Sequence, residues 1–320
     1  MKVEHTEGDS YTDRLFQWLW QEEKLPIRLE KVIKPKVYKV RYNDHPMILK
    51  GYRRAQTLEQ QINFFQDWNY ASISAARPLP FQDNIYTKSK LGCAWGLFEW
   101  VQGKHADFDN HYDREKAVQV LQQFHRTTKG IATLAIPRDP LYIKWERRLE
   151  QFEETQDVFS EYRKRSIYQE LRLNMIIQLE RFSNHPWGEV EEKAWENNEW
   201  LHGDVAHHNF IINNKHEIKL IDFDLLHTGP HLYDHIQLGQ RFLPYLENQR
   251  ALLLQYFKHT PDPDIWLKGV LVPADLLREW LYGYRRCLRG EVSFSKHIKK
   301  LEKAWESRRK FVRYAEHMLR

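Results

Sequence analysis

The chain has 320 residues, 42% of them hydrophobic, so it can bury a substantial core and form one large domain or two smaller ones. Its net charge of +5 favours anionic ligands only mildly, and because Lys and Arg are interleaved with acids, the pattern argues against a nucleic-acid-binding surface. No segment is apolar enough for a membrane span or a targeting signal, and two cysteines cannot form a disulfide framework, so a cytoplasmic protein is expected.

The first third of the chain combines two helical segments with short alternating ones. After Pro26 the pattern becomes β-branched and alternating, which is typical of strands, and an Asn-Asp-His turn predicts a hairpin between the second and third of them. The expected helices cover residues 10–23 and 57–71. The expected strands cover residues 27–33, 36–42, 46–52, 84–89 and 93–101.

From Gly103 onward the pattern is mostly helical, with one polar hairpin in the middle. Helices are expected over residues 114–130, 142–159 and 166–182, and in several pieces over 233–320. Residues 209–214 and 218–224 are typical of two short strands with polar ends. The sequence therefore predicts an α+β fold with two lobes: residues 1–101, with a leading helix, a five-stranded sheet and one helix, and residues 102–320, mostly helical. Clefts between lobes are common ligand sites.

Three polar residues in the second lobe have a spacing that suits phosphoryl transfer from ATP. That reaction needs a carboxylate near the acceptor hydroxyl, oxygen ligands for Mg²⁺ and a cation on the phosphates. Asp204 lies in "HGDVAHHN", Asn209 follows five positions later, and Asp222 lies in "LIDFD" at the end of a strand. The stretch from Asn209 to Asp222 is about the length of a hairpin, which would bring an amide oxygen and a carboxylate together.

These segments resemble the aminoglycoside phosphotransferase and choline kinase-like branch of the protein-kinase-like superfamily, which includes kinase-like proteins of bacterial spore coats. "HGDVAHHNFII" is similar to the catalytic loop of that branch, "LIDFD" to its metal-binding strand, and "GPHLYD" to the next segment, in which Asp234 matches a buried Asp that braces the loop. "MILKGY", "LFEWVQGK" and "VLQQFHRTTKG" resemble the lysine-bearing strand, the hinge and the first helix of the large lobe. The resemblance covers roughly residues 28–240 in order, and it implies a bilobal protein-kinase-like fold with a small antiparallel-sheet lobe.

Carried over by position, the resemblance assigns the catalytic loop and a metal site. Asp204 would orient or deprotonate the hydroxyl of a small-molecule acceptor that the sequence does not identify. Asn209 and Asp222 would ligate Mg²⁺. His202 is expected to be a buried support rather than an acid or base, and Asp224 either assists the metal or is a solvated carboxylate.

The resemblance also assigns a nucleotide site for ATP or GTP. Lys50 would hold the α- and β-phosphates, with Glu59 on the following helix as its acidic partner. Apolar spacing leaves Gln61 as the alternative inward residue of that helix. Backbone groups near Glu99 and Val101 would receive the base.

Two features depart from the family pattern. The family usually has a phosphate loop with Gly or Ser between the first strands, whereas this chain has "KVIKPKVYKV", in which Pro35 removes one backbone donor. Lys34 or Lys36 would have to supply charge instead. Ala206 stands two positions after Asp204, where protein kinases have Lys.

Two classes of function follow from these observations. The leading hypothesis is a Mg²⁺- and ATP- or GTP-dependent phosphotransferase acting on a small-molecule hydroxyl; a protein substrate is disfavoured because no long activation segment fits between "IDFD" and "GPHLYD". The alternative, favoured by the glycine-free loop, is a kinase-fold binding or structural protein with little catalysis, such as a spore-associated coat component with protein partners. A metal phosphohydrolase built on Asp222 and Asp224 would leave Lys50 unexplained.

Overall fold

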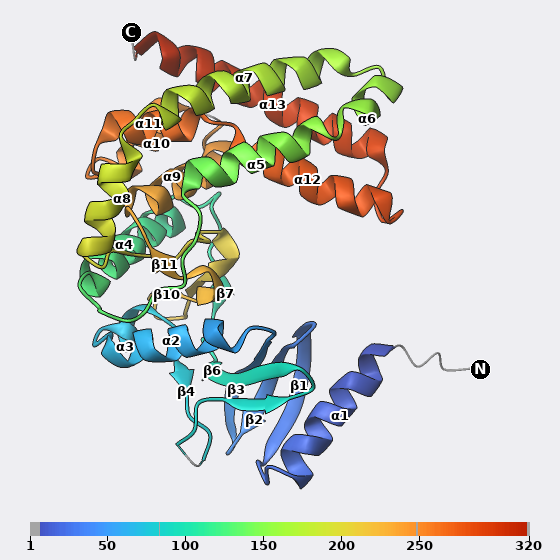
Figure 1. The fold of residues 1–320 in the computed structure, drawn as a ribbon, viewed down its shortest axis with the longest axis vertical. Helices are drawn as coiled ribbons and strands as arrows, with labels where there is room; N and C mark the ends of the chain where they lie inside the picture. The colour runs from blue at the N-terminus through green and yellow to red at the C-terminus, as the bar shows by residue number, and fades with distance from the viewer. Residues whose placement is uncertain (1–6, 83, 248, 319–320) are drawn as a thin grey trace.

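The computed structural model describes residues 7–82, 84–247 and 249–318, with an antiparallel sheet at one end of the molecule and helices at the other (Figure 1). The elements up to residue 99 are α1 (Glu7–Gln21), β1 (Ile27–Lys34), β2 (Val37–Tyr42), β3 (His45–Tyr52), α2 (Ala55–Asp67), α3 (Ala71–Ser74), β4 (Pro78–Leu79), β5 (Lys88–Lys90) and β6 (Cys93–Glu99). The helices after residue 99 are α4 (His111–Thr128), α5 (Leu141–Glu153), α6 (Gln156–Glu161), α7 (Arg165–Ser183), α8 (Trp187–Glu196), α9 (Leu232–Phe242), α10 (Arg250–Tyr256), α11 (Pro263–Leu271), α12 (Ala274–Leu288) and α13 (Phe294–Met318). The strands of that part are β7 (Lys104–His105), β8 (Trp200–Leu201), β9 (Phe210–Ile212), β10 (Ile218–Leu220) and β11 (His227–Thr228).

The described residues of the N-terminal region form a six-stranded antiparallel sheet in the order β1-β2-β3-β6-β4, with β5 pairing β6. Five strands were expected; the sixth, β4, has only two residues, too few to show an alternating pattern. The hairpin between β2 and β3 is as predicted. Its turn residues Asn43 and Asp44 have φ values of 48° and 62°, the left-handed conformation that a two-residue type I′ turn requires.

Helices α1 and α2 cover opposite faces of this sheet (Figure 1). Leu15 and Leu19 of α1 pack in one apolar cluster with Leu49 of β3. Leu58 of α2 packs in another cluster with Tyr52. Because successive strand residues point to opposite faces, Lys50 of β3 lies on the face that α2 covers, which is the side of the C-terminal region.

Helix α2 ties the sheet to the helical region. Beyond Leu58 its apolar residues belong to the C-terminal core: the Phe64 ring centroid lies 4.8 Å from that of Trp200, and Phe65 packs edge-on against Phe223 at 5.0 Å. Gln60 Nε2 also donates to the Leu226 carbonyl at 2.9 Å. One helix therefore fixes the position of the sheet relative to the loops that carry Asp204 and Asp222.

The C-terminal region contains the predicted hairpin, here β9 and β10, paired antiparallel with Phe210 opposite Leu220. The single helix expected over 142–159 is instead two helices, α5 and α6. Its break has a local cause, because the buried Thr155 hydroxyl donates to the Phe152 carbonyl at 2.7 Å and competes with the helical hydrogen bonds. Among the described helices, none combines the length and apolar character that crossing a bilayer requires.

Candidate active site

The loop that carries Asp204 is held in shape by a buried carboxylate. Asp234 is fully buried in α9 and accepts hydrogen bonds from the backbone N–H groups of His202 (2.8 Å) and Gly203 (3.0 Å), and from His125 Nε2 (3.1 Å). Burial alone would raise the pKa of Asp234, but these donors bring it well below its ordinary value. The brace expected from the sequence is therefore present.

Gly203 and His202 complete this support. Gly203 has φ 78°, and a Cβ there would lie 2.6 Å from the Leu225 carbonyl oxygen, so only glycine fits. His202 is fully buried; its Nε2 bonds the Ile221 carbonyl at 3.0 Å and its Nδ1 accepts the Asp204 N–H at 3.3 Å. Both ring nitrogens are used, so His202 is the predicted support.

The Asp204 carboxylate is left open to solvent and to a second cavity, described below. Its nearest charged partner is Arg241 of α9, whose Nη2 lies 3.6 Å from Oδ1. Asn209 donates its side-chain N–H to the Asp204 carbonyl at 2.8 Å, so its amide oxygen is the atom free to accept a cation. The loop thus presents one carboxylate and one amide oxygen.

The hairpin brings Asn209 beside the acidic segment, because the Ile221 N–H donates to the Asn209 carbonyl at 2.9 Å. Asp222 follows in a left-handed conformation, φ 65°, and Phe223–Leu225 form a short 3-10 turn rather than the end of a strand. This geometry corrects the expected strand alternation. The turn, not a strand face, directs the carboxylates of both Asp222 and Asp224 to one place.

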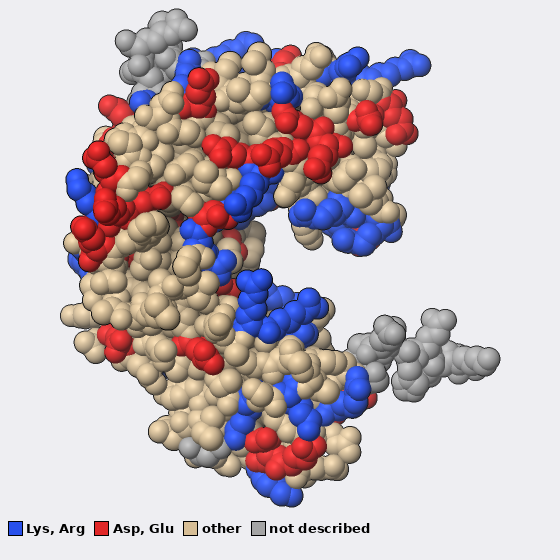
Figure 2. Space-filling model, viewed as in Figure 1, with Lys and Arg blue, Asp and Glu red and all other residues tan. Residues whose placement is uncertain are grey.

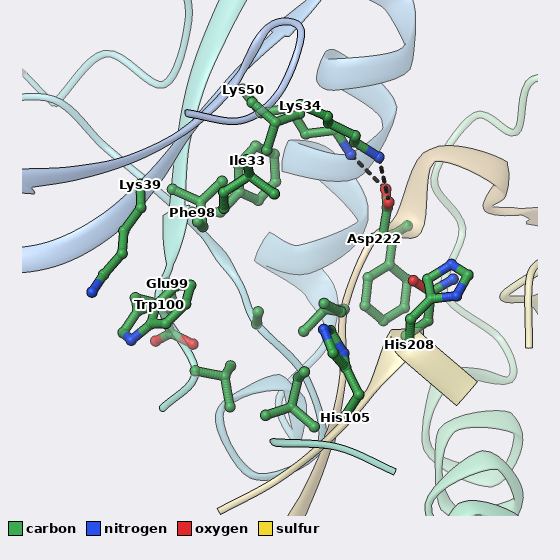
Figure 3. A pocket seen from close by; sticks show the side chains of 18 of the residues that line it. Ile33, Lys34, Lys39, Lys50, Phe98, Glu99, Trp100, His105, His208 and Asp222 are labelled. Carbon is green, nitrogen blue, oxygen red and sulfur yellow. Dashed lines mark hydrogen bonds and ion pairs between the residues drawn. The ribbon is translucent and has the colours of Figure 1, made fainter. Parts of the chain in front are cut away.

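That place is the Lys50 ammonium (Figure 3 shows Lys50 and Lys34 reaching Asp222). Lys50 Nζ lies 2.5 Å from Asp222 Oδ1 and 2.6 Å from Asp224 Oδ1, and Lys34 Nζ lies 3.4 Å from Asp222 Oδ2. Burial raises the pKa of Asp222, but the two lysines outweigh burial and hold it below its ordinary value. Asp222 is therefore charged at neutral pH. Two carboxylates and the Asn209 oxygen are a donor set that suits a hard divalent cation.

The expected partnership between Lys50 and Glu59 is not formed. Glu59 is exposed on α2, because the apolar stripe of the helix turns its neighbours inward instead. Gln61 is the α2 residue that reaches the cluster, with Nε2 3.4 Å from Asp224 Oδ1, and it is buried. Asp222 and Asp224 take the role of acidic partners in this structure.

A cavity of about 600 Å³ extends from this cluster between the sheet and the β9–β10 hairpin. Figure 3 shows Phe98, Glu99 and Trp100 on its sheet side and His105 and His208 across from them. The Glu99 side chain is paired with the Arg77 side chain, and the backbone N–H of Glu99 donates to the Arg77 carbonyl at 2.9 Å. The backbone of residues 100–102 lies outside any strand and borders the cavity at Trp100 and Val101.

The turn between β1 and β2 stands where a phosphate loop was sought. It is a tight turn with Pro35 followed by Lys36 at φ 65°, and the Lys36 carbonyl accepts the Gly51 N–H at 2.9 Å. Lys36 Nζ turns to Cys93 Sγ, 2.9 Å away. Lys34, the last residue of β1, reaches the acidic cluster, so of the two lysines expected to supply charge here it is the one placed to do so.

A second cavity of about 400 Å³ adjoins Asp204, and His208 lines both cavities. Sequence reasoning missed its most distinctive residues, which are basic. They come from before α5, from α5, α9 and α12, and no local motif connects them. They are Arg138, Lys144, Arg148, Arg241 and Arg278.

The sequence pattern of a phosphotransferase enzyme family matches residues 28–266. The chain belongs to this family. No curated protein matches the sequence closely enough to name a relative.

Solved structures share the fold at low identity. An aminoglycoside phosphotransferase from Alicyclobacillus acidocaldarius subsp. acidocaldarius is 16% identical with a TM-score of 0.69, over 91% of this chain and 92% of that one. Spectinomycin phosphotransferase APH(9)-Ia, solved with ADP and spectinomycin, is 12% identical with a TM-score of 0.58, over 93% of each chain. The choline kinase LicA from Streptococcus pneumoniae is 11% identical with a TM-score of 0.55, over 94% and 99%. The predicted bilobal kinase-like fold is therefore confirmed.

Proposed function

We propose that this protein transfers the γ-phosphoryl group of ATP or GTP to a hydroxyl of a small molecule. The observation that carries the proposal is the meeting of two cavities at one loop: Lys50 and Asp222 line the larger cavity, Asp204 lines the smaller, and His208 lines both. A nucleotide in the first would point its phosphates at an acceptor in the second. The ADP and spectinomycin bound together by a structure of the same fold support this division.

The residues have distinct tasks in this reaction. Asp204 accepts the proton of the acceptor hydroxyl as its oxygen forms a bond to the γ-phosphorus; the bond from that phosphorus to the β–γ bridging oxygen breaks, and the nucleoside diphosphate leaves with that electron pair. Lys50, with Lys34 beside it, binds phosphate oxygens and opposes their charge. The proton passes from Asp204 to solvent when the product leaves.

Asn209 and Asp222, with Asp224 close by, are the residues that would hold Mg²⁺. The fit rests on the free amide oxygen of Asn209 and on the ionised carboxylate of Asp222, both lining the larger cavity. The ion, when bound, supplies positive charge to the phosphates. Glu59 is exposed and takes no part in this scheme. The purine base of the nucleotide would lie against Trp100 and Val101.

A second candidate is a kinase-fold binding protein without turnover, such as a coat component with protein partners. The tight Pro35–Lys36 turn favours it, because Pro35 lacks a backbone donor for a phosphate and Lys36 Nζ is directed to Cys93 Sγ. The intact set of Asp204, Asn209 and Asp222 favours the phosphotransferase.

One measurement separates the two candidates: the melting temperature of the full chain with ATP or GTP, with and without Mg²⁺, followed by slow nucleotide hydrolysis. A nucleotide bound at 100 times its Kd would add about 2.7 kcal/mol of stability. A phosphotransferase both gains stability and consumes nucleotide. Stabilisation without consumption of nucleotide supports the binding protein. If nucleotide neither stabilises the protein nor is consumed, the chain has no nucleotide site and the phosphotransferase proposal is refuted.

A further inference from the structure

The smaller cavity is bordered by five cationic side chains. Lys144 and Arg148 come from α5, Arg138 from the segment before it, Arg241 from α9 and Arg278 from α12. Figure 2 shows Lys and Arg side chains gathered on both walls of the hollow between the two ends of the molecule. The acceptor side of the site is therefore strongly basic.

The carboxylates nearby do not balance these cations. Asp275 lines the cavity, but Arg308 already binds it through both nitrogens, at 3.2 and 2.6 Å. Glu279 lies 3.1 Å from Arg278 and 4.0 Å from Arg241. Asp204 is the remaining acid of the lining, 3.6 Å from Arg241.

Three of the cations form no ion pair in the part of the chain that the structure describes, although acids lie near enough to act on them electrostatically. Arg148 Nη1 donates to the Ala274 carbonyl at 2.9 Å, and Arg138 Nη2 to the Asp224 carbonyl at 2.7 Å. Arg138 Nε is buried without a hydrogen-bond partner among these residues. Lys144 forms no ion pair with a described residue. Partly buried cations without an ion pair leave a net positive field in the cavity.

The titration of the cluster agrees with its geometry. Burial and the neighbouring Arg278 together lower the pKa of Arg148 to about 10, and Asp275 opposes them only in part. Burial and Arg278 likewise lower the pKa of Arg241 to about 10. Each guanidinium is thus destabilised by desolvation and by its neighbours, which an anion among them would relieve.

We propose that the acceptor is an anionic alcohol, a small hydroxylated compound carrying a phosphate or carboxylate group, with its anion held by Arg148, Arg241 and Arg278 and its hydroxyl at Asp204. Transfer to this acceptor rests on the proposed function, whereas binding of the anion does not. The bonds made and broken are those given above: the acceptor oxygen gains the phosphoryl group, its proton goes to Asp204, and the nucleoside diphosphate leaves. The same field repels polycationic acceptors.

The binding half is tested with inorganic phosphate as the probe, on the full chain, by melting temperature at constant ionic strength with chloride as the reference. Phosphate is expected to stabilise the protein more than chloride, and Arg148→Gln or Arg278→Gln to weaken its apparent affinity about tenfold, the loss of one charge-assisted hydrogen bond. Arg147→Gln is the matched control, because Arg147 is next to Arg148 on α5 but is exposed and pairs with Asp139. Its phosphate response should equal that of the wild type.

Lys34→Gln identifies the cavity in which phosphate binds, since Lys34 lines only the larger one. If Lys34→Gln abolishes the response while Arg148→Gln and Arg278→Gln keep it, the anion lies in the nucleotide cavity and the inference is wrong. The inference is also wrong if phosphate raises the melting temperature no more than chloride does while ATP or GTP stabilises the protein. If phosphate binds through the arginines but no nucleotide does, the anion site stands and the proposed function fails.

The acceptor half is tested by nucleotide consumption with three panels: sugar phosphates, hydroxy acids, and the cationic alcohols choline and kanamycin. Stimulation by the first or second panel, with KM raised at least about tenfold by Arg148→Gln, supports the proposal and distinguishes phosphate from carboxylate. Arg147→Gln should leave both kcat and KM unchanged. If only the cationic alcohols stimulate nucleotide consumption, the proposal of an anionic acceptor is wrong.

Discussion

Asp222 has a backbone conformation that decides how its role can be tested. Its φ of 65° suits Asn better than Ala, so Asp222→Asn removes the charge without adding backbone strain. We expect the variant to fold normally and to lose the Mg²⁺-dependent part of nucleotide stabilisation, because an amide is a much weaker Mg²⁺ ligand than a carboxylate. Melting temperatures with nucleotide, with and without Mg²⁺, measure this. Asp44→Asn is the control, because Asp44 is also left-handed at φ 62° but exposed in the β2–β3 turn; an unchanged Mg²⁺ response in Asp222→Asn would remove the metal assignment.

The carboxylates of Asp204 and Asp234 differ in their hydrogen bonds and in their exposure to solvent. The Asp234 carboxylate of α9 accepts hydrogen bonds from the backbone of His202 and Gly203, whereas the Asp204 side chain is 36% exposed and lines the smaller cavity. We expect Asp204→Asn to lower nucleotide turnover at least about 100-fold, the usual contribution of general-base catalysis, with the melting temperature and nucleotide affinity preserved. Steady-state kinetics and nucleotide titration provide the two readouts. Turnover equal to that of the wild type would show that Asp204 is not the base.

At the scale of elements, the sequence predicted what depends on neighbours along the chain. The β2–β3 hairpin, the β9–β10 hairpin and the loop of Asp204 follow local spacing, and the structure has them all. The prediction that Glu59 is the acidic partner of Lys50 was wrong, because the orientation of Glu59 depends on which face of α2 packs on the sheet. Gln61, not Glu59, lies on that face. The basic cavity could not be predicted, since its cationic residues are far apart in the sequence and only the packing of α5, α9 and α12 brings them together. They are Arg138, Lys144, Arg148, Arg241 and Arg278.

Close packing of α12 on α13 depends on a glycine. A Cβ on Gly283 would lie 2.0 Å from the His297 ring, which is held by a 2.9 Å hydrogen bond to the Trp280 carbonyl. We expect Gly283→Ala to destabilise the protein by about 1–3 kcal/mol, the cost of overpacking a core. Gly188→Ala, in the first turn of α8, is the control, because no atom of the described residues lies within 4 Å of its Cβ position; without a clash, Ala should stabilise the protein by up to about 1 kcal/mol. Urea unfolding measures both, and equal signs for the two variants would contradict the packing argument.

The whole molecule should lose stability in mild acid, because it holds desolvated, neutral histidines near the loop that carries Asp204. The pKa of His227 is lowered to about 4, that of His231 to about 2 and that of His235 to about 3, chiefly by burial. The cations Lys129, Lys144 and Arg138 each lower one of these pKa values further, and Asp234 opposes the shift. In the unfolded chain a histidine titrates near 6.5. Below that pH the unfolded state binds protons that the folded state excludes, so the free energy of unfolding falls as the pH falls from about 6.5 toward 4.

Each such histidine contributes up to about 1.4 kcal/mol per pH unit to this slope, or about 4 kcal/mol per unit for the three. Urea unfolding between pH 7.5 and 5 measures it. His235→Leu should make the slope shallower by up to about 1.4 kcal/mol per unit, since His235 has no hydrogen-bond partner at either ring nitrogen in the described structure and packs near Phe257. His259→Gln, at an exposed position, should leave the slope as it is. A stability that stays constant from pH 7 to 5, or a His235→Leu slope equal to that of the wild type, would mean that these histidines take up protons within the folded protein.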